Sequence, residues 1–263
     1  MIRDITIGQY YPTNSYIHRL DPRVKILSTF AYIISLFLID NYIGYLIVAL
    51  FIYTITKVAK IPLKFILKGL KAIFIIVLFT VILNVFMAPG ETILYEFGKV
   101  KVTLEGIKLA IRMVSRLVLL IIGSSLMTLT TSPIELTDGI ESLLKPFSKI
   151  GVPAHEIAMM MSISLRFIPI LLEETDKIMK AQMARGADFE SGGIIKRAKA
   201  LIPILVPLFI SAFRRADELA MAMEARCYRG GENRTRMKEL RYESKDYIAL
   251  SIMAILVVVT ILI

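Results

Sequence analysis

The chain has 263 residues, of which 56% are hydrophobic and 21% charged, and its mean hydropathy is +0.67. Soluble globular chains are about 45–50% apolar, so this composition excludes a disordered chain and an ordinary soluble enzyme. The single cysteine excludes an internal disulfide and hence a secreted disulfide scaffold. In so apolar a chain, the net charge of +10 is more typical of the cytoplasmic side of a membrane protein than of nucleic-acid binding.

Five apolar segments predict membrane-spanning helices, each of which needs about 20 mostly apolar residues. In chain order the segments cover residues 25–39, 42–55, 72–88, 107–130 and 247–263. Only Asp40 and Asn41 separate the first two, which predicts a tight hairpin, and Pro89-Gly90 is expected to end the third. The expected fold is therefore all-α and polytopic, with about five transmembrane helices and a long helical region outside the membrane.

The basic residues are distributed asymmetrically about these segments. Of the 32 Lys and Arg residues, 27 fall on one predicted side and five fall between residues 99 and 116. Because basic residues concentrate on the cytoplasmic side, the N-terminus is expected inside and, after five spans, the C-terminus outside. The expected organisation is a four-span membrane domain (1–131), a helical cytoplasmic region (132–244) and a final transmembrane helix (245–263).

The cytoplasmic segment opens with a strong helix-start signal. Ser132-Pro133-Ile134-Glu135 places a capping serine, a proline at the first helical position and a glutamate three residues after the serine, which is a capping box. The helix that follows is apolar on one side and is expected to stop near Gly151.

Two long helices are expected next, at about residues 154–185 and 194–229. Glycines that suit the left-handed position after a helix, Gly186 and Gly230-Gly231, are expected to close them. Each helix starts apolar and finishes polar. The apolar parts are marginal for a span but long enough to lie along the membrane boundary or to form a re-entrant hairpin.

These two long helices end with similar tripeptides, Ala184-Arg185-Gly186 and Ala225-Arg226-Cys227. Small neighbours allow another backbone to approach closely, and the planar guanidinium group can bind a carboxylate through two hydrogen bonds. One interpretation is thus a pair of docking tips. The alternative is two ordinary helix C-termini with solvated arginines.

Other residues carry weaker signals. Met159, Met160 and Met161 suit a surface that binds several partners, although ordinary core filling explains them equally well. Arg112 and Arg116 share one face of the fourth span and either face the bundle or extend toward the interface. We expect no catalytic residues, no metal site and no cofactor site, because the chain has no Cys/His cluster and no phosphate-binding loop.

Several stretches, in this order and spacing, resemble the T component of energy-coupling factor (ECF) transporters, a transmembrane scaffold. They are residues 15–25, 129–133, 164–169, 184–186 and 225–227. The resemblance extends over nearly the whole chain. Cys227 departs from the pattern, because the family commonly has glycine there.

The resemblance implies a non-catalytic, multi-pass energy-coupling subunit of an importer in the bacterial cell membrane, with residues 132–244 as its cytoplasmic coupling helices. Its implied partners are two ABC-type ATPase subunits, which bind ATP and receive the two arginine tripeptides, and a membrane-embedded substrate-binding (S) subunit. It implies no nucleic-acid partner. The implied cargo is a vitamin or related micronutrient.

Three alternatives remain. One is a scaffold dedicated to a single substrate such as cobalt, nickel or biotin. The others are an intramembrane enzyme that holds an anionic lipid or phosphate with Arg112 and Arg116, and a membrane anchor whose basic helices bind anionic lipid.

Overall fold

The fold is that of a computed structural model, which describes residues 10–87, 92–97, 100–189, 193–231 and 239–262. The expected helix end at Pro89-Gly90 lies outside these residues. The elements run in the order α1 (Pro22–Leu38), α2 (Tyr42–Ala59), α3 (Leu63–Met87), β1 (Ile93–Phe97), β2 (Val100–Thr103), α4 (Leu104–Thr130), α5 (Pro133–Leu144), the 3₁₀ helix η1 (Lys145–Ile150), α6 (Ala154–Ala184), α7 (Ile194–Ala225) and α8 (Ser244–Leu262).

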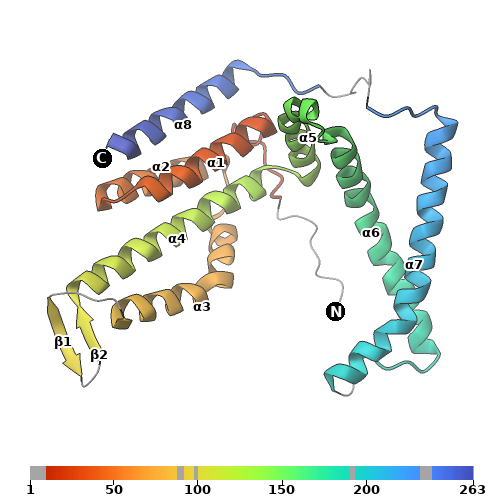
Figure 1. The fold of residues 1–263 in the computed structure, drawn as a ribbon, viewed down its shortest axis with the longest axis horizontal. Helices are drawn as coiled ribbons and strands as arrows, with labels where there is room; N and C mark the ends of the chain where they lie inside the picture. The colour runs from red at the N-terminus through yellow and green to blue at the C-terminus, as the bar shows by residue number, and fades with distance from the viewer. Residues whose placement is uncertain (1–9, 88–91, 98–99, 190–192, 232–238, 263) are drawn as a thin grey trace. The chain divides into compact units, whose positions relative to one another are not determined.

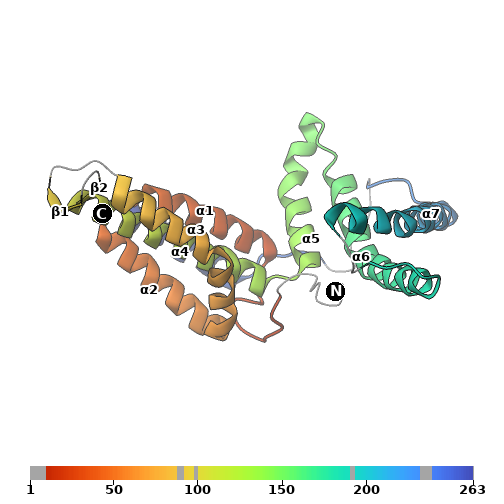
Figure 2. The same cartoon turned by 90° about the horizontal axis from the view of Figure 1, so that it is seen from below.

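The chain divides into two compact units, which we describe separately. Among the described residues, the bundle unit comprises 10–139 and 239–262, and the paired-helix unit comprises 140–231. The helices of both units are drawn in Figures 1 and 2.

Within the bundle unit, α4 is the central helix, because it packs against α1, α2 and α3, while α8 packs against α1 (Figure 1). The core includes the fully buried side chains of Leu36, Val48 and Leu129. Tyr32 of α1 also belongs to this core, and its hydroxyl donates to the Leu119 carbonyl of α4 at 2.7 Å. A Cβ at Gly123 would overlap the Tyr32 ring, so only glycine permits this close helix contact.

Four helices among the described residues are long and apolar enough to cross a membrane, namely α2, α4, α6 and α8. A fifth candidate is α3, which bends by 59° between Leu63–Lys71 and Ile73–Phe86. The expected all-α polytopic fold with about five spans is therefore confirmed, but the set of helices differs. With 17 residues, α1 is short for a crossing, whereas α6, expected among the cytoplasmic helices, is long and apolar enough for one by length and composition.

The connection between α1 and α2 and the start of α5 are as the sequence predicts. Three residues, Ile39–Asn41, separate α1 from α2. At the start of α5, the Glu135 N–H donates to Ser132 Oγ and the Ser132 N–H donates to Glu135 Oε2, both at 3.3 Å, which completes the capping box.

Two expectations need correction. A two-stranded antiparallel hairpin, β1–β2, lies between α3 and α4, where no strand was expected. In addition, α7 ends at Ala225 rather than near Arg229, and Cys227, not Gly230-Gly231, takes the left-handed position after it, with a φ of 56°. A helix ends where its chain first enters the left-handed region, so the later glycines belong to the following loop.

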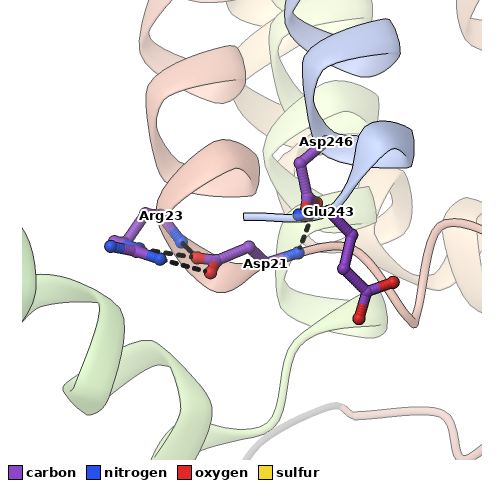
Figure 3. A network of polar contacts seen from close by, with 4 residues as sticks. All are labelled: Asp21, Arg23, Glu243 and Asp246. Atoms are coloured by element: carbon purple, nitrogen blue, oxygen red, sulfur yellow. Dashed lines mark hydrogen bonds and ion pairs between the residues drawn. The ribbon is translucent and has the colours of Figure 1, made fainter. Parts of the chain in front are cut away.

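The start of α8 is tied to the start of α1 by a buried carboxylate, as Figure 3 shows. Asp246 accepts hydrogen bonds from the backbone N–H groups of Asp21, at 2.9 Å, and Glu243, at 2.8 Å. Asp21 in turn accepts from the backbone N–H of Arg23 at 2.9 Å and pairs with its guanidinium group at 2.7 Å. The Asp21-Pro22-Arg23 segment thus joins the two ends of the sequence within the bundle.

Candidate functional site

The expected site lies on α6 and α7, which pack against each other within the paired-helix unit and cross in Figure 1. Three contacts give their relative direction. Gln182 Nε2 donates to the Pro203 carbonyl at 3.5 Å, Arg215 Nη2 lies 3.5 Å from Glu174 Oε2, and His155 Nε2 lies 3.2 Å from the Tyr228 hydroxyl. As the residue number falls along α6 it rises along α7, so the helices are antiparallel.

This direction places the two arginine tripeptides at opposite ends of the pair. Residues 184–186 end α6 beside the first part of α7, whereas residues 225–227 end α7 beside the first turn of α6. A 31-residue helix is roughly 46 Å long. One compact binding surface on a small partner therefore cannot contact both tripeptides.

The end of α6 has a complete Schellman motif. The Gly186 N–H donates to the Met183 carbonyl at 2.9 Å, and the Ala187 N–H donates to the Gln182 carbonyl at 3.0 Å. Gly186 has a φ of +89°, the left-handed conformation that this motif requires. Glycine at this position is therefore explained by the backbone alone, whatever binds there.

The end of α7 repeats the same motif. The Cys227 N–H donates to the Glu224 carbonyl at 2.8 Å, and the Tyr228 N–H donates to the Met223 carbonyl at 3.0 Å. Cys227 occupies the position of Gly186, with a φ of 56°. A side chain on a residue in the left-handed conformation costs about 1–2 kcal/mol. Cysteine in place of glycine therefore strains the backbone at the end of α7.

Both arginines sit at the matching C-cap position and are exposed. Within the described part of the chain, neither the Arg185 nor the Arg226 guanidinium group makes a hydrogen bond or ion pair. Ala184 and Ala225, which precede them, are exposed as well. The two ends thus present the same backbone, the same cation and the same small neighbour.

Sequence reasoning missed the contacts that hold the end of α7 in place. His155, at the start of α6, lies between the Glu141 carboxylate, at 3.1 Å, and the Tyr228 hydroxyl, at 3.2 Å. A Cβ on Gly231 would lie 2.5 Å from the His155 ring, so the chain after α7 passes directly over this side chain. The signal in the sequence was weak, because these residues are far apart in it.

The three consecutive methionines do not share one face of α6. Successive helical residues are separated by about 100°, and Met160 is 56% exposed while Met159 and Met161 are half-buried.

A broader apolar surface lies on α7 and has regular helical spacing. Its exposed members are Ile202, Leu205, Val206, Phe209, Ile210 and Phe213. Positions three and four apart share a helix face, so this α7 stripe is continuous. The sequence showed the apolar run but not that this face lacks cover in the paired-helix unit.

Arg116 of α4 faces the bundle, where its Nη2 donates to the Ile39 carbonyl and its Nε to the Tyr45 hydroxyl, both at 3.2 Å. It therefore caps the end of α1. Arg112 lies beside it, with its guanidinium carbon 5.9 Å from the centre of the Tyr42 ring. No group of three or more potential metal ligands occurs among the residues that the structure describes.

The fold and the site define an all-α, multi-pass membrane protein in which a pair of antiparallel helices presents two arginine-bearing ends. The family described as the cobalt transport protein CbiQ matches residues 13–237.

Curated relatives extend this match to nearly the full chain. "Energy-coupling factor transporter transmembrane protein EcfT" of Thermosediminibacter oceani is 61% identical over 257 residues, covering 97% of both chains. The protein of that name from Clostridium kluyveri is 61% identical over 263 residues, covering 100% of this chain and 97% of the relative. The Bacillus subtilis one is 50% identical over 246 residues, covering 94% and 93%. The chain belongs to this family of transporter transmembrane components, and the resemblance noted in its sequence is confirmed.

Proposed function

We propose that the chain is the energy-coupling subunit of an ECF importer. It transmits ATP-driven motion of two ABC-type ATPase subunits to a membrane-embedded S subunit, which delivers a vitamin or related micronutrient. The observation that carries this proposal is the pair of matched, arginine-capped ends of α6 and α7, whose guanidinium groups have no partner among the described residues. The names of the relatives support it.

In this proposal each end docks on its own ATPase subunit. Arg185 and Arg226 each bind a carboxylate of that subunit through two hydrogen bonds, and Ala184, Gly186, Ala225 and Cys227 allow its surface to approach closely. Because the ends lie at opposite ends of an antiparallel pair, movement of the two ATPases changes the angle between α6 and α7.

The S subunit is proposed to rest on the apolar surfaces of the same helices. The α7 stripe offers six exposed apolar side chains, and Met160 adds a flexible one on α6. Met159 and Met161 are half-buried and would support this surface from beneath. Non-directional apolar contacts suit a partner that must slide or be exchanged.

The chain itself is proposed to be non-catalytic and to bind no cofactor, since ATP is bound by the partner subunits. We place its N-terminus in the cytoplasm because 27 of the 32 Lys and Arg residues fall on that side in the five-span arrangement. Reporter fusions at both ends test this, and a cytoplasmic C-terminal reporter would contradict the arrangement.

The docking role is tested by the double variant Arg185→Ala/Arg226→Ala. Breaking a desolvated charge pair costs about 2–5 kcal/mol, so ATPase co-purification and substrate uptake should both be largely lost. A rim-exposed pair would cost about 1 kcal/mol or less. Arg214→Ala is the matched control, because Arg214 is also exposed on α7 but lies away from its end. Wild-type co-purification in the double variant would mean that the two ends are ordinary helix caps.

A second candidate is a scaffold dedicated to cobalt or a similar single substrate, which the name of the matching family favours. Co-purification separates the two candidates. A shared scaffold should recover several different S subunits from its own membrane, and a dedicated one should recover a single substrate-binding partner.

A further inference from the structure

The bundle unit contains a cavity of about 620 Å³ that no part of the proposed coupling mechanism uses. Its walls come from α1, α2, α4 and α8 and are almost entirely apolar. Its volume falls within the range of roughly 300–1,000 Å³ that is usual for small-molecule sites. Leu50 lines the cavity and is 66% exposed, so the cavity opens onto the outer surface of the bundle.

The cavity has a polar end and an apolar end. At one end α1 and α8 begin and α4 ends, as shown by hydrogen bonds from Lys25 Nζ to the Thr130 carbonyl, at 2.8 Å, and from the Tyr16 hydroxyl to the Lys245 carbonyl, at 3.3 Å. From Lys25 the wall continues seven residues along α1 to Tyr32, which corresponds to about 10 Å. The cavity thus runs from the end of the bundle toward its middle.

Lys25 is the feature that gives this cavity chemical character. Among the described residues that line it, Lys25 alone carries a charge. It is only 6% exposed, and its Nζ donates to the carbonyl oxygens of His18, at 3.0 Å, and Thr130. An ammonium group has three N–H donors, so one remains after these two bonds.

No carboxylate of the described residues forms an ion pair with Lys25, and the acidic side chains of this region are engaged elsewhere. Asp21 binds Arg23, Glu135 closes the capping box of α5, and Asp246 accepts from two backbone N–H groups. The charges of these three carboxylates still attract Lys25 through space. A buried cation whose direct contacts are only carbonyl oxygens remains costly, however, and an anion in contact with it would lower the cost.

We propose that this cavity binds an anionic phospholipid, with an acyl chain along the apolar walls and the phosphate group at Lys25. The bilayer supplies hydrocarbon chains at the open side, and a cation at the end of the bundle is where a headgroup would lie. A soluble anion would use Lys25 but leave the apolar walls wet. A neutral lipid would fill the apolar part of the cavity but leave Lys25 without an anion in direct contact.

The test measures lipid binding to the full-length chain in detergent micelles by native mass spectrometry, with dioleoylphosphatidylglycerol and dioleoylphosphatidylcholine as probes. The wild type should prefer phosphatidylglycerol. Lys25→Met, which keeps the apolar stem and removes the charge, should bind phosphatidylglycerol about tenfold more weakly, as loss of one charge-assisted hydrogen bond implies. Lys57→Met is the matched control, because Lys57 is exposed near the end of α2 and does not line the cavity.

A second variant tests the cavity without touching Lys25 or its hydrogen bonds. Ser28 lines the cavity, and Ser28→Phe should fill part of it and weaken the binding of both lipids. Unchanged binding in Ser28→Phe, or a retained preference for phosphatidylglycerol in Lys25→Met, would overturn the proposal. Binding of inorganic phosphate to the wild type as strongly as phosphatidylglycerol would also overturn it. Loss of S-subunit co-purification in Ser28→Phe, with lipid binding unchanged, would overturn it as well, because the cavity would then bind a protein partner.

Discussion

Asp246 Oδ1 accepts a hydrogen bond from the backbone N–H of Asp21 at 2.9 Å, across 225 positions of sequence. Its second oxygen accepts from the Glu243 N–H at 2.8 Å, and the side chain is only 1% exposed. One carboxylate therefore caps α8 and fixes the entry of the chain into α1.

Asp246→Ala should lower the free energy of unfolding by about 3 kcal/mol, because it leaves two backbone donors of this junction unsatisfied. Asp246→Asn keeps one acceptor oxygen and should cost about 1 kcal/mol. Unfolding in a titration with denaturing detergent measures both. Glu239→Ala, which removes an exposed partner of Arg241, serves as the control and should change little. Equal stability of Asp246→Ala and the wild type would show that α8 is held by its apolar contacts alone.

Cys227→Gly should stabilise the paired-helix unit by about 1 kcal/mol, because glycine adopts the left-handed conformation without the steric cost of a Cβ. Gly186→Ala should destabilise it by a similar amount for the same reason. Thermal unfolding of the two variants provides the comparison.

Gly193→Ser is a suitable control for both changes. Gly193 precedes α7 with a φ of −71°, and nothing lies within 4 Å of a Cβ placed there. Serine is favoured at a helix N-cap, so no loss is expected. A loss in Gly193→Ser as large as that in Gly186→Ala would mean that the sign of φ is not the cause.

Tyr228→Phe should loosen the end of α7, because it removes the hydroxyl that contacts His155. The expected cost is about 1 kcal/mol, confined to the last turn of α7 and the residues after it. Hydrogen exchange of the backbone amides in residues 223–231 measures the change. Tyr53→Phe on the exposed surface of α2 is the matched control, and exchange rates unaffected by Tyr228→Phe would rule out this anchoring role.

The bundle unit should lose stability as the pH falls below 6.5, because burial lowers the pKa of His18 below its ordinary value of 6.5. The hydrogen bond between Nε2 and the Tyr11 carbonyl, at 3.0 Å, acts in the opposite direction. Since the unfolded chain binds the proton more tightly, stability is complete above pH 6.5 and declines until the pH reaches the pKa of the folded state. His18→Gln should flatten this dependence, measured as the midpoint of thermal unfolding from pH 7.5 to about 5. A variant with the wild-type slope would assign the pH dependence to another group.

The features that sequence reasoning predicted correctly are local ones. The short connection between α1 and α2 follows from two polar residues between apolar runs, and the capping box of α5 follows from Ser132 and Glu135 at a fixed spacing. Gly186 was identified as the residue after α6 because a left-handed backbone favours glycine. In each case the physical cause lies within a few residues.

The features that it missed depend on distant contacts or on residues without a strong preference. Nothing in the sequence near Asp21 indicates Asp246, and nothing near Tyr228 indicates His155. Cysteine has no preference for the left-handed conformation that Cys227 adopts. The end of α7 was therefore predicted at the later glycines, beyond its observed end. The arginine-bearing ends were identified as a pair, but their position at opposite ends follows only from the antiparallel packing of α6 and α7.

Cys227 is the single cysteine of the chain, and it is exposed. A thiol-reactive fluorophore or spin label therefore attaches at one defined point, immediately after Arg226, without any engineering of the wild-type sequence. The strained residue that departs from the family pattern is therefore a natural probe of docking, because its thiol should react in the chain alone and be protected once an ATPase subunit covers the end of α7.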